Sequence, residues 1–450
     1  MLGRLATSRW WRGVEYALIW LSVFLVPWQL RHTLWFAQLN GDYFEYGSWQ
    51  VYASDVVILC LLIVGAGVVG RVGFRSLPRK VGVPLLAVLV WMTITAWWAA
   101  DRGTAVVVAM HWWLFYGWCI YLVNRISKIE QLLWPLVIGA AVQGGWGLAQ
   151  YIFNQSLGLS WLGESVLDPV QPGISVIELS GVRHLRAYGL LPHPNILAGV
   201  LVAGVVGVLG LAQQQLRRWQ WVVLGISGVA LVSGVVLAFS RIAWVIFVLV
   251  IMGAMVGGVI RRQGKLIYIA GLMLGIAAVV AISQWQYIQV RFQGAERLEQ
   301  QSIDERRLGL AQWQQVISQA PDKGVGLGNY ATALARVVPE QPAWWYAPVH
   351  NIYLVIAGEV GAIGAAMWLW FLVGLGQWWW RNRQRGVVFG LGTPLMIWLG
   401  CGLTDHWPIS LQQGQLLFFL ALALIILSCR SMIQNEWEGW SYGRARTERT

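Results

Sequence analysis

Two short groups of polar residues at the ends of apolar runs have side chains suited to chemistry on an anionic substrate. His350-Asn351 opens one long apolar run, and Ser240-Arg241 stands between two others. Histidine exchanges its proton near neutral pH and can act as a general base, whereas arginine binds phosphate oxygens through paired N–H donors. We therefore expect His350 to be the base and Arg241 an anion ligand, with Asn351 orienting either His350 or a substrate hydroxyl. The competing interpretations are a polar helix cap and a snorkelling arginine.

A second set of cations precedes another apolar run. Arg183, Arg186 and His193 crowd the stretch that ends at Asn195, where the next run begins. These residues fall in a connection that the charge pattern of the chain places on the non-cytoplasmic side of the membrane. Basic residues are otherwise uncommon there, so their accumulation favours anion binding. Arg186 is the candidate to bind phosphate together with Arg241. Arg183, His193 and Asn195 are candidates to contact substrate, and a solvated loop end is the alternative.

Arg306 and Arg307 form a third cationic element, within a segment that we predict to be helical from Ile303 to Ala320. We expect this helix to cover the site and both arginines to contact substrate. The glycine-rich string at 324–330 follows no strand and has no Lys-Ser or Lys-Thr pair, so a tight turn is favoured over a nucleotide-binding loop. The predicted helix has an apolar stripe formed by Leu308, Leu310, Trp313, Val316 and Ile317.

Composition places the chain among membrane proteins. It has 450 residues, of which 57% are hydrophobic and only 12% charged, about half the charged share of ordinary soluble domains. The net charge of +12 comes from short basic clusters between apolar runs, which is typical of membrane topology and disfavours nucleic-acid binding. The four cysteines lie in or beside apolar segments. No disulfide framework, metal site or cofactor is expected.

The apolar runs predict about twelve transmembrane helices of about twenty residues. Every second connection between them is short and basic, so the positive-inside rule makes these connections and both termini cytoplasmic. The segment 349–379 exceeds a simple span and is expected to be tilted, broken or extended above the membrane. The predicted segments are 14–30, 54–70, 81–100, 103–123, 131–152, 193–212, 219–237, 240–260, 265–284, 349–379, 386–403 and 411–429.

The resulting fold class is an all-α polytopic membrane protein with a large, partly helical outer loop. We divide it into membrane helices 1–5, a first long outer loop, membrane helices 6–9, the large outer loop, and membrane helices 10–12 with a cytoplasmic tail. These parts span 1–152, 153–192, 193–284, 285–348 and 349–450.

In this order, the polar elements resemble the bacterial O-antigen ligase and O-antigen polymerase superfamily over residues 180–375. The final pattern, His350-Asn351 followed after nine residues by Gly361 and then by Gly364, is the one associated with ligases. The spacing from Arg307 to Trp313 departs from the family, which makes Arg306 an alternative equivalent. The matching positions are Arg186, Gly189, Pro194-Asn195, Ser240-Arg241, Arg307, Trp313, Pro321, the string 324–329, His350-Asn351, Gly361 and Gly364.

This resemblance implies a GT-C-like glycosyltransferase of the bacterial inner membrane, acting in lipopolysaccharide biosynthesis at the cell envelope, with its site facing the periplasm. The donor would be a glycan on a polyprenyl (undecaprenyl) diphosphate carrier. A ligase moves the glycan to lipid A–core or a similar acceptor hydroxyl. Neither a nucleotide sugar nor a metal is implied. With His350 as base and arginines on the diphosphate, we expect inversion at the anomeric carbon.

Three other functions stay open at this stage. A polymerase of the same superfamily would move the glycan to another repeat unit. A component of an inorganic-carbon or other solute transporter would place its site near the bilayer midplane, on broken helices. A non-catalytic scaffold would not require His350 and the arginines to converge.

Overall fold

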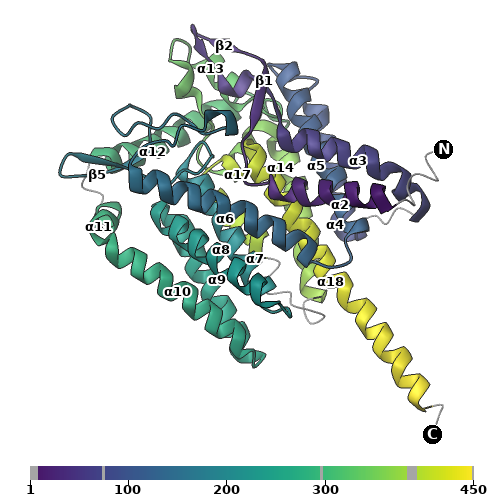
Figure 1. The fold of residues 1–450 in the computed structure, drawn as a ribbon. Coiled ribbons are helices and arrows are strands. Elements are labelled where there is room, and N and C mark those ends of the chain that lie inside the picture. Colours follow the sequence, from purple (N-terminus) through teal and green to yellow (C-terminus); the bar gives the residue numbers. More distant parts are fainter. Residues whose placement is uncertain (1–8, 73–76, 294–296, 383–392, 448–450) are drawn as a thin grey trace.

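Long apolar helices form the body of the molecule, and shorter elements gather at one end of it (Figure 1). The computed structural model describes residues 9–72, 77–293, 297–382 and 393–447. The body consists of α2 (Arg9–Phe24), α3 (Ala53–Val72), α4 (Arg79–Thr95), α5 (Arg102–Arg125), α6 (Glu130–Phe153), α7 (Pro194–Leu211), α8 (Arg218–Leu237), α9 (Arg241–Ile260), α10 (Gly264–Ser283), α14 (Ile352–Asn382), α16 (Thr393–Gly402) and α18 (Gln412–Thr447).

Eight of these helices are long and apolar enough to cross a membrane, namely α5 to α10, α14 and the first half of α18. Each of the twelve predicted segments overlaps one helix. The four helices outside this set of eight have shorter apolar segments. α2 and α4 have 16 and 17 residues, and the described apolar parts of α3 and α16 are shorter still. The protein is therefore polytopic and mostly helical. Residues 386–392 of the eleventh predicted segment lie outside the described residues.

α7 occupies the centre of the bundle because its sequence permits close contact on every side. Its span is 94% buried, and glycines recur along it where neighbouring helices approach. A Cβ on Gly204 would lie 2.7 Å from Leu231 of α8, and one on Gly207 would lie 2.6 Å from Val137 of α6. Small residues that let backbones approach are the usual basis of helix packing in membranes.

Two basic links gather at the end of the bundle opposite the shorter elements. Lys265, at the start of α10, donates from Nζ to the carbonyl oxygen of Gln214 at 3.0 Å and lies over the ring of Trp221. The α7–α8 and α9–α10 links therefore lie together. This is the arrangement that the charge pattern predicts for one side of the membrane.

The outer segments contain strands as well as helices, which corrects the prediction of an all-α fold. Within the described residues, three antiparallel two-stranded sheets form where short runs of the chain pair with one another. The strands are β1 (Arg31–Trp35) with β4 (Trp49–Tyr52), β2 (Gln38–Leu39) with β3 (Asp42–Tyr43), and β5 (Val176–Leu179) with β6 (Val182–Leu185).

The segment 285–348 is largely helical, as predicted for the large loop. Its helix α12 starts at Arg297, six residues before the predicted start, and ends at Ile317. The buried face differs from the predicted stripe, because Leu308 and Leu310 are exposed while Gly309, Gln312 and Val316 pack inward. The other outer elements are α11 (Trp285–Gln293), α13 (Tyr330–Val337), α17 (Trp407–Ser410), and the 3-10 turns η1 (Glu45–Gly47), η2 (Ser160–Leu162) and η3 (Ala343–Tyr346).

The long helix α14 is interrupted at Gly361, where φ is +69°. The glycine-rich string docks into this interruption: the N–H groups of Val325 and Gly326 donate to the carbonyls of Gly358 and Glu359 at 3.0 and 2.9 Å. A Cβ on Gly361 would lie 2.3 Å from the carbonyl oxygen of Asp322. Since the N–H groups of this string bind the protein itself, the string joins loop to helix rather than binding phosphate.

Candidate functional site

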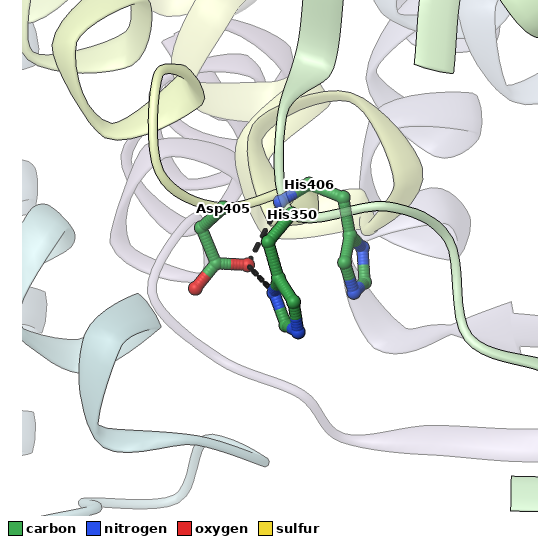
Figure 2. Close-up of side chains that lie close together, drawn as sticks. All are labelled: His350, Asp405 and His406. Atoms are coloured by element: carbon green, nitrogen blue, oxygen red, sulfur yellow. Dashed lines mark hydrogen bonds and ion pairs between the residues drawn. The ribbon is translucent and has the colours of Figure 1, made fainter. Parts of the chain in front are cut away.

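His350 lies beside a carboxylate that comes from the link between α16 and α17. Nδ1 of His350 is 3.7 Å from Oδ1 of Asp405, which also accepts the backbone N–H of His406 at 2.8 Å (Figure 2). The Asp405 side chain is 10% exposed and that of His350 is 39% exposed. Burial raises the pKa of Asp405, but the contact with His350 and the charges of the nearby histidines lower it by more, so the net shift is downward. An ionised Asp405 favours a proton on Nδ1 of His350 and leaves Nε2 as the basic atom.

Asp405 is also connected to the cationic segment that precedes α7 and contains Arg186 and His193. Its Oδ2 accepts from Nδ2 of Asn195 at 3.0 Å, and Oδ1 of Asn195 accepts from Nη2 of Arg186 at 3.0 Å. Asn195 lies in the first turn of α7, and His193 caps that helix by accepting the N–H of Asn195 on Nδ1 at 3.1 Å. The chain Arg186–Asn195–Asp405–His350 therefore joins three segments that are far apart in the sequence.

Arg186 is buried, and its guanidinium is largely committed to the protein. Nε donates to the carbonyl of Ala238 at 2.8 Å, and Nη2 donates to that of Phe239 at 3.3 Å, at the C-terminus of α8. Nη1 donates to Oγ of Ser175 at 2.6 Å. A cation at this position satisfies helix-terminal carbonyls. A bidentate contact with diphosphate, as predicted from sequence, would require some of these hydrogen bonds to be exchanged.

Further arginines lie near Arg186, so several positive charges are concentrated in this part of the molecule. Arg291 of α11 donates from Nε to the carbonyl of Phe239 at 3.2 Å, and Arg241 donates from Nη1 to the carbonyl of Arg291 at 3.1 Å. Burial lowers the pKa of Arg291, and the charges of Arg186, Arg241 and Arg306 lower it further. Such a cluster of cations is stabilised when an anion binds to it.

The two neighbouring arginines of α12 have different surroundings. Both residues are exposed to solvent. Partial burial nevertheless lowers the pKa of Arg306, the charge of Arg241 lowers it further, and the charge of Asp405 opposes this shift. Arg307 instead has a side chain that is 78% exposed and lies 3.7 Å from Asp304 on the same helix. The structure thus brings Arg306, and not Arg307, into the electrostatic environment of the site.

Three other predicted residues hold the local structure. Asn351 caps α14, because its Oδ1 accepts the N–H groups of Tyr353 and Leu354 at 2.9 and 3.1 Å. Arg183 donates to the carbonyl of Val170 at 2.7 Å within the first outer loop, away from the cluster. Ser240 is buried at the N-cap of α9, directly before Arg241.

Three residues of the site did not emerge from the sequence pattern, namely Asp405, its neighbour His406, and Arg291. Asp405 lies in a connection that seemed only a short link, although an acidic residue beside His406 on the outer side was a usable signal. Arg291 follows the ninth predicted span on the outer side. The topological argument that singled out Arg241 applies equally to it.

The same histidines and carboxylate have the residue types of a metal site. One ligand atom from each of His350, Asp405 and His406 lies within 4.8 Å of the other two. Two imidazoles and a carboxylate are a common catalytic ligand set for zinc and iron. The sequence predicts a metal-independent enzyme, so chelation experiments must decide whether a cation contributes.

An apolar groove runs along the bundle from the site toward the opposite end. It has a volume of about 660 Å³. Its lining extends from Ile242, next to Arg241 in sequence, and Leu403, two residues before Asp405, to Arg261 at the far end. α7, α9, α14 and α16 supply most of its walls. The groove has the shape and polarity to hold a hydrocarbon chain whose polar head lies at the arginines.

Residues 226–369 match the family model described as O-antigen ligase. The matched segment runs from α8 into α14 and contains Arg241, Arg291, Arg306 and His350. Arg186, Asn195, Asp405 and His406 lie outside it, although the structure places them at the same site. No curated protein matches the chain.

Proposed function

We propose that this chain, whose central region matches the O-antigen ligase family, is a ligase-type glycosyltransferase of the inner membrane. It would transfer a glycan from a polyprenyl-diphosphate carrier to an acceptor hydroxyl at the periplasmic face. The observation that carries this proposal is the convergence of a histidine beside a carboxylate with a cluster of arginines around the buried Arg186. A catalytic set must surround one reacting centre, whereas a scaffold has no such requirement.

The donor is inferred from two neighbouring features. As the glycosidic bond breaks, the leaving diphosphate gains negative charge, and preorganised cations stabilise that charge most effectively in a low-dielectric site. Arg241 and Arg306 are the best placed to contact the diphosphate. Arg186 and Arg291 add positive charge nearby and hold the turn between α8 and α9. The apolar groove beginning at Ile242 would receive the carrier's hydrocarbon tail.

The acceptor is activated by His350. Its Nδ1–H is directed at Asp405, so Nε2 can remove the proton from the acceptor hydroxyl as the oxygen attacks the anomeric carbon. Asp405 then stabilises the imidazolium that forms. Attack opposite the leaving diphosphate gives inversion. Contacts between catalytic groups, such as that of His350 with Asp405, are commonly long in the absence of substrate and shorten when substrate binds.

A polymerase of the same superfamily and a solute transporter are the remaining alternatives. The interruption of α14 at Gly361 is a feature that transporters share. Here, however, the break is filled by the glycine-rich string rather than opening onto a polar cavity. Comparison of surface glycans separates ligase from polymerase: loss of a ligase leaves long chains on the carrier, whereas loss of a polymerase leaves single units.

Transfer assays in membranes test this proposal through a matched pair of arginines. Arg306→Ala should lower transfer about 10²–10³-fold, the usual loss when one electrostatic stabiliser is removed. Arg307→Ala, one residue away on the exposed surface, should retain activity within about twofold. His350→Ala should lower transfer about 10²–10⁴-fold, as expected for loss of a general base.

Chelation completes the test. Activity that survives prolonged treatment with EDTA supports the metal-independent mechanism, while loss that is restored by a divalent cation assigns His350, Asp405 and His406 to a metal. Full activity of the Arg241→Ala, Arg306→Ala and His350→Ala proteins at normal protein levels would refute the glycosyltransferase mechanism altogether.

A further inference from the structure

His406 is held in one tautomer by the residue one helical turn after it. The Ser410 hydroxyl donates to the carbonyl oxygen of His406 at 2.9 Å, so its only proton is engaged. Nδ1 of His406 lies 2.5 Å from the same Oγ. Because Oγ has no second proton to donate, Nδ1 must carry the hydrogen in this contact. Nε2 of His406 is therefore the unprotonated nitrogen, with its lone pair free to accept a hydrogen bond.

That lone pair faces the reaction site and is open to a ligand. Among the described residues no hydrogen-bond partner is found for Nε2 of His406, yet this atom is not sealed from solvent. The rings of His350 and His406 are 5.5 Å apart between centroids and extend in the same direction (Figure 2). One nitrogen of each ring lies within 4.8 Å of the other.

Burial lowers the pKa of His406 to about 4, an effect that Asp405 opposes only in part. The ring is thus neutral at neutral pH. A neutral, buried imidazole is a weak base but a good fixed acceptor of hydrogen bonds. His350 is more exposed and lies beside the Asp405 carboxylate, which can stabilise the imidazolium that forms when the ring accepts a proton. The two histidines therefore offer two acceptors with different roles.

We propose that the acceptor substrate presents two adjacent hydroxyls, a vicinal diol of a sugar ring, to this pair of histidines. One hydroxyl gives its proton to Nε2 of His350 and attacks the donor. The neighbouring hydroxyl donates to Nε2 of His406 and fixes which oxygen attacks. Adjacent hydroxyl oxygens are roughly 3 Å apart, so two hydrogen bonds of ordinary length can bridge two rings whose centroids are 5.5 Å apart. His406 is then a specificity-determining residue, an inference that rests on the proposed transfer reaction.

The test compares two substrates in one assay, using reconstituted protein, carrier-linked glycan and membranes that bear the unmodified acceptor. His406→Ala should lower kcat/KM for the acceptor roughly 10- to 100-fold, the range for loss of one substrate hydrogen bond, and leave KM for the donor within about twofold. His406→Gln, whose amide oxygen can accept, should recover part of this loss. His32→Ala, on the exposed strand β1, is the matched histidine control and should behave as wild type.

Acceptor membranes that are oxidised with periodate and reduced with borohydride contain no vicinal diol, and the wild-type protein should fail to use them. Undiminished transfer to oxidised membranes would overturn the proposal. So would a His406→Ala protein that is fully active, or one in which donor and acceptor parameters fall together, which indicates a structural role. Absence of transfer by the wild-type protein to unmodified acceptor membranes would instead refute the proposed function itself.

Discussion

At the scale of single residues, the site depends on which histidines are held neutral. His350 is partly exposed beside Asp405, whereas His193 and His406 lie in surroundings that disfavour their charged forms. For His193, burial lowers the pKa to about 3, and the charge of Arg186 acts in the same direction. Its role as the cap of α7 uses the neutral ring, since Nδ1 accepts the N–H of Asn195.

This shift predicts an acid-dependent loss of stability. The unfolded chain binds a proton at His193 below about pH 6.5, but the folded protein does not do so until about pH 3. Stability is therefore fully present above the unfolded pKa and declines as pH falls through this window, by at most about 1.4 kcal/mol per pH unit for one proton. His193→Asn, which can still cap the helix, should flatten the fall in thermal midpoint between pH 6.5 and 5.

The comparison requires a control, because the pKa of His406 is also lowered in the folded protein. This residue therefore makes stability fall with pH in the same direction. The variant should therefore show a smaller slope rather than none. His32→Ala should leave the slope unchanged. An unchanged slope in His193→Asn would mean that the ring is already protonated in the folded protein at pH 5.

At the scale of elements, backbone-to-backbone packing between the large outer loop and α14 positions His350. The glycines of the motif serve this contact: Gly324 and Gly361 both have positive φ and have no room for a Cβ. Trp313 adds a second link, since its Nε1 donates to the carbonyl of Leu354 at 2.8 Å. The loop helix α12, which bears Arg306, is thereby tied to the start of α14, where His350 lies.

Gly361→Ala should release this contact. A side chain here is strained by positive φ, at a cost of about 1–3 kcal/mol, and its Cβ would meet the Asp322 carbonyl. Hydrogen exchange should show lost protection in peptides covering Val325 and Gly326, whose N–H groups bind α14. Transfer should fall with it, because Arg306 and His350 lose their common support.

Gly271→Ala is the matched control, because a Cβ at that position of α10 has open space around it. It should retain both protection and activity. If Gly361→Ala keeps the loop protected, the glycine is not required by this contact, and the packing explanation of the motif fails.

At the scale of the whole molecule, helix ends alternate so that the site and the basic links lie at opposite ends. His350, Arg186, Arg241 and Asp405 are joined by contacts at one end. The α7–α8 and α9–α10 links meet at the other. The positive-inside rule predicts that the basic end is cytoplasmic, which would turn the site outward.

Cysteine labelling checks this orientation. In a Cys60→Ala background, Glu340→Cys in the exposed outer loop should react with an impermeant maleimide in sealed spheroplasts. Arg218→Cys, at the start of α8, should react only after permeabilisation. Labelling of both positions from outside, or of Arg218→Cys alone, would contradict the predicted topology and place the site in the wrong compartment for a periplasmic acceptor.

The sequence by itself determined the elements, because apolar length and the distribution of basic residues act locally along the chain. It predicted the membrane helices, the helix that carries Arg306, and the candidates Arg186, Arg241 and His350. The short strands escaped it, since their alternating runs are too brief to stand out among long apolar segments. The tertiary structure alone decided which of these residues share a site.

Asp405, Asn195 and His406 come together only where α7, α14 and the α16–α17 link meet, and the side chain of Arg307 is exposed and contacts Asp304 on its own helix. Hydrogen bonds and desolvation depend on neighbours in space, and residues of one site can lie far apart along the chain.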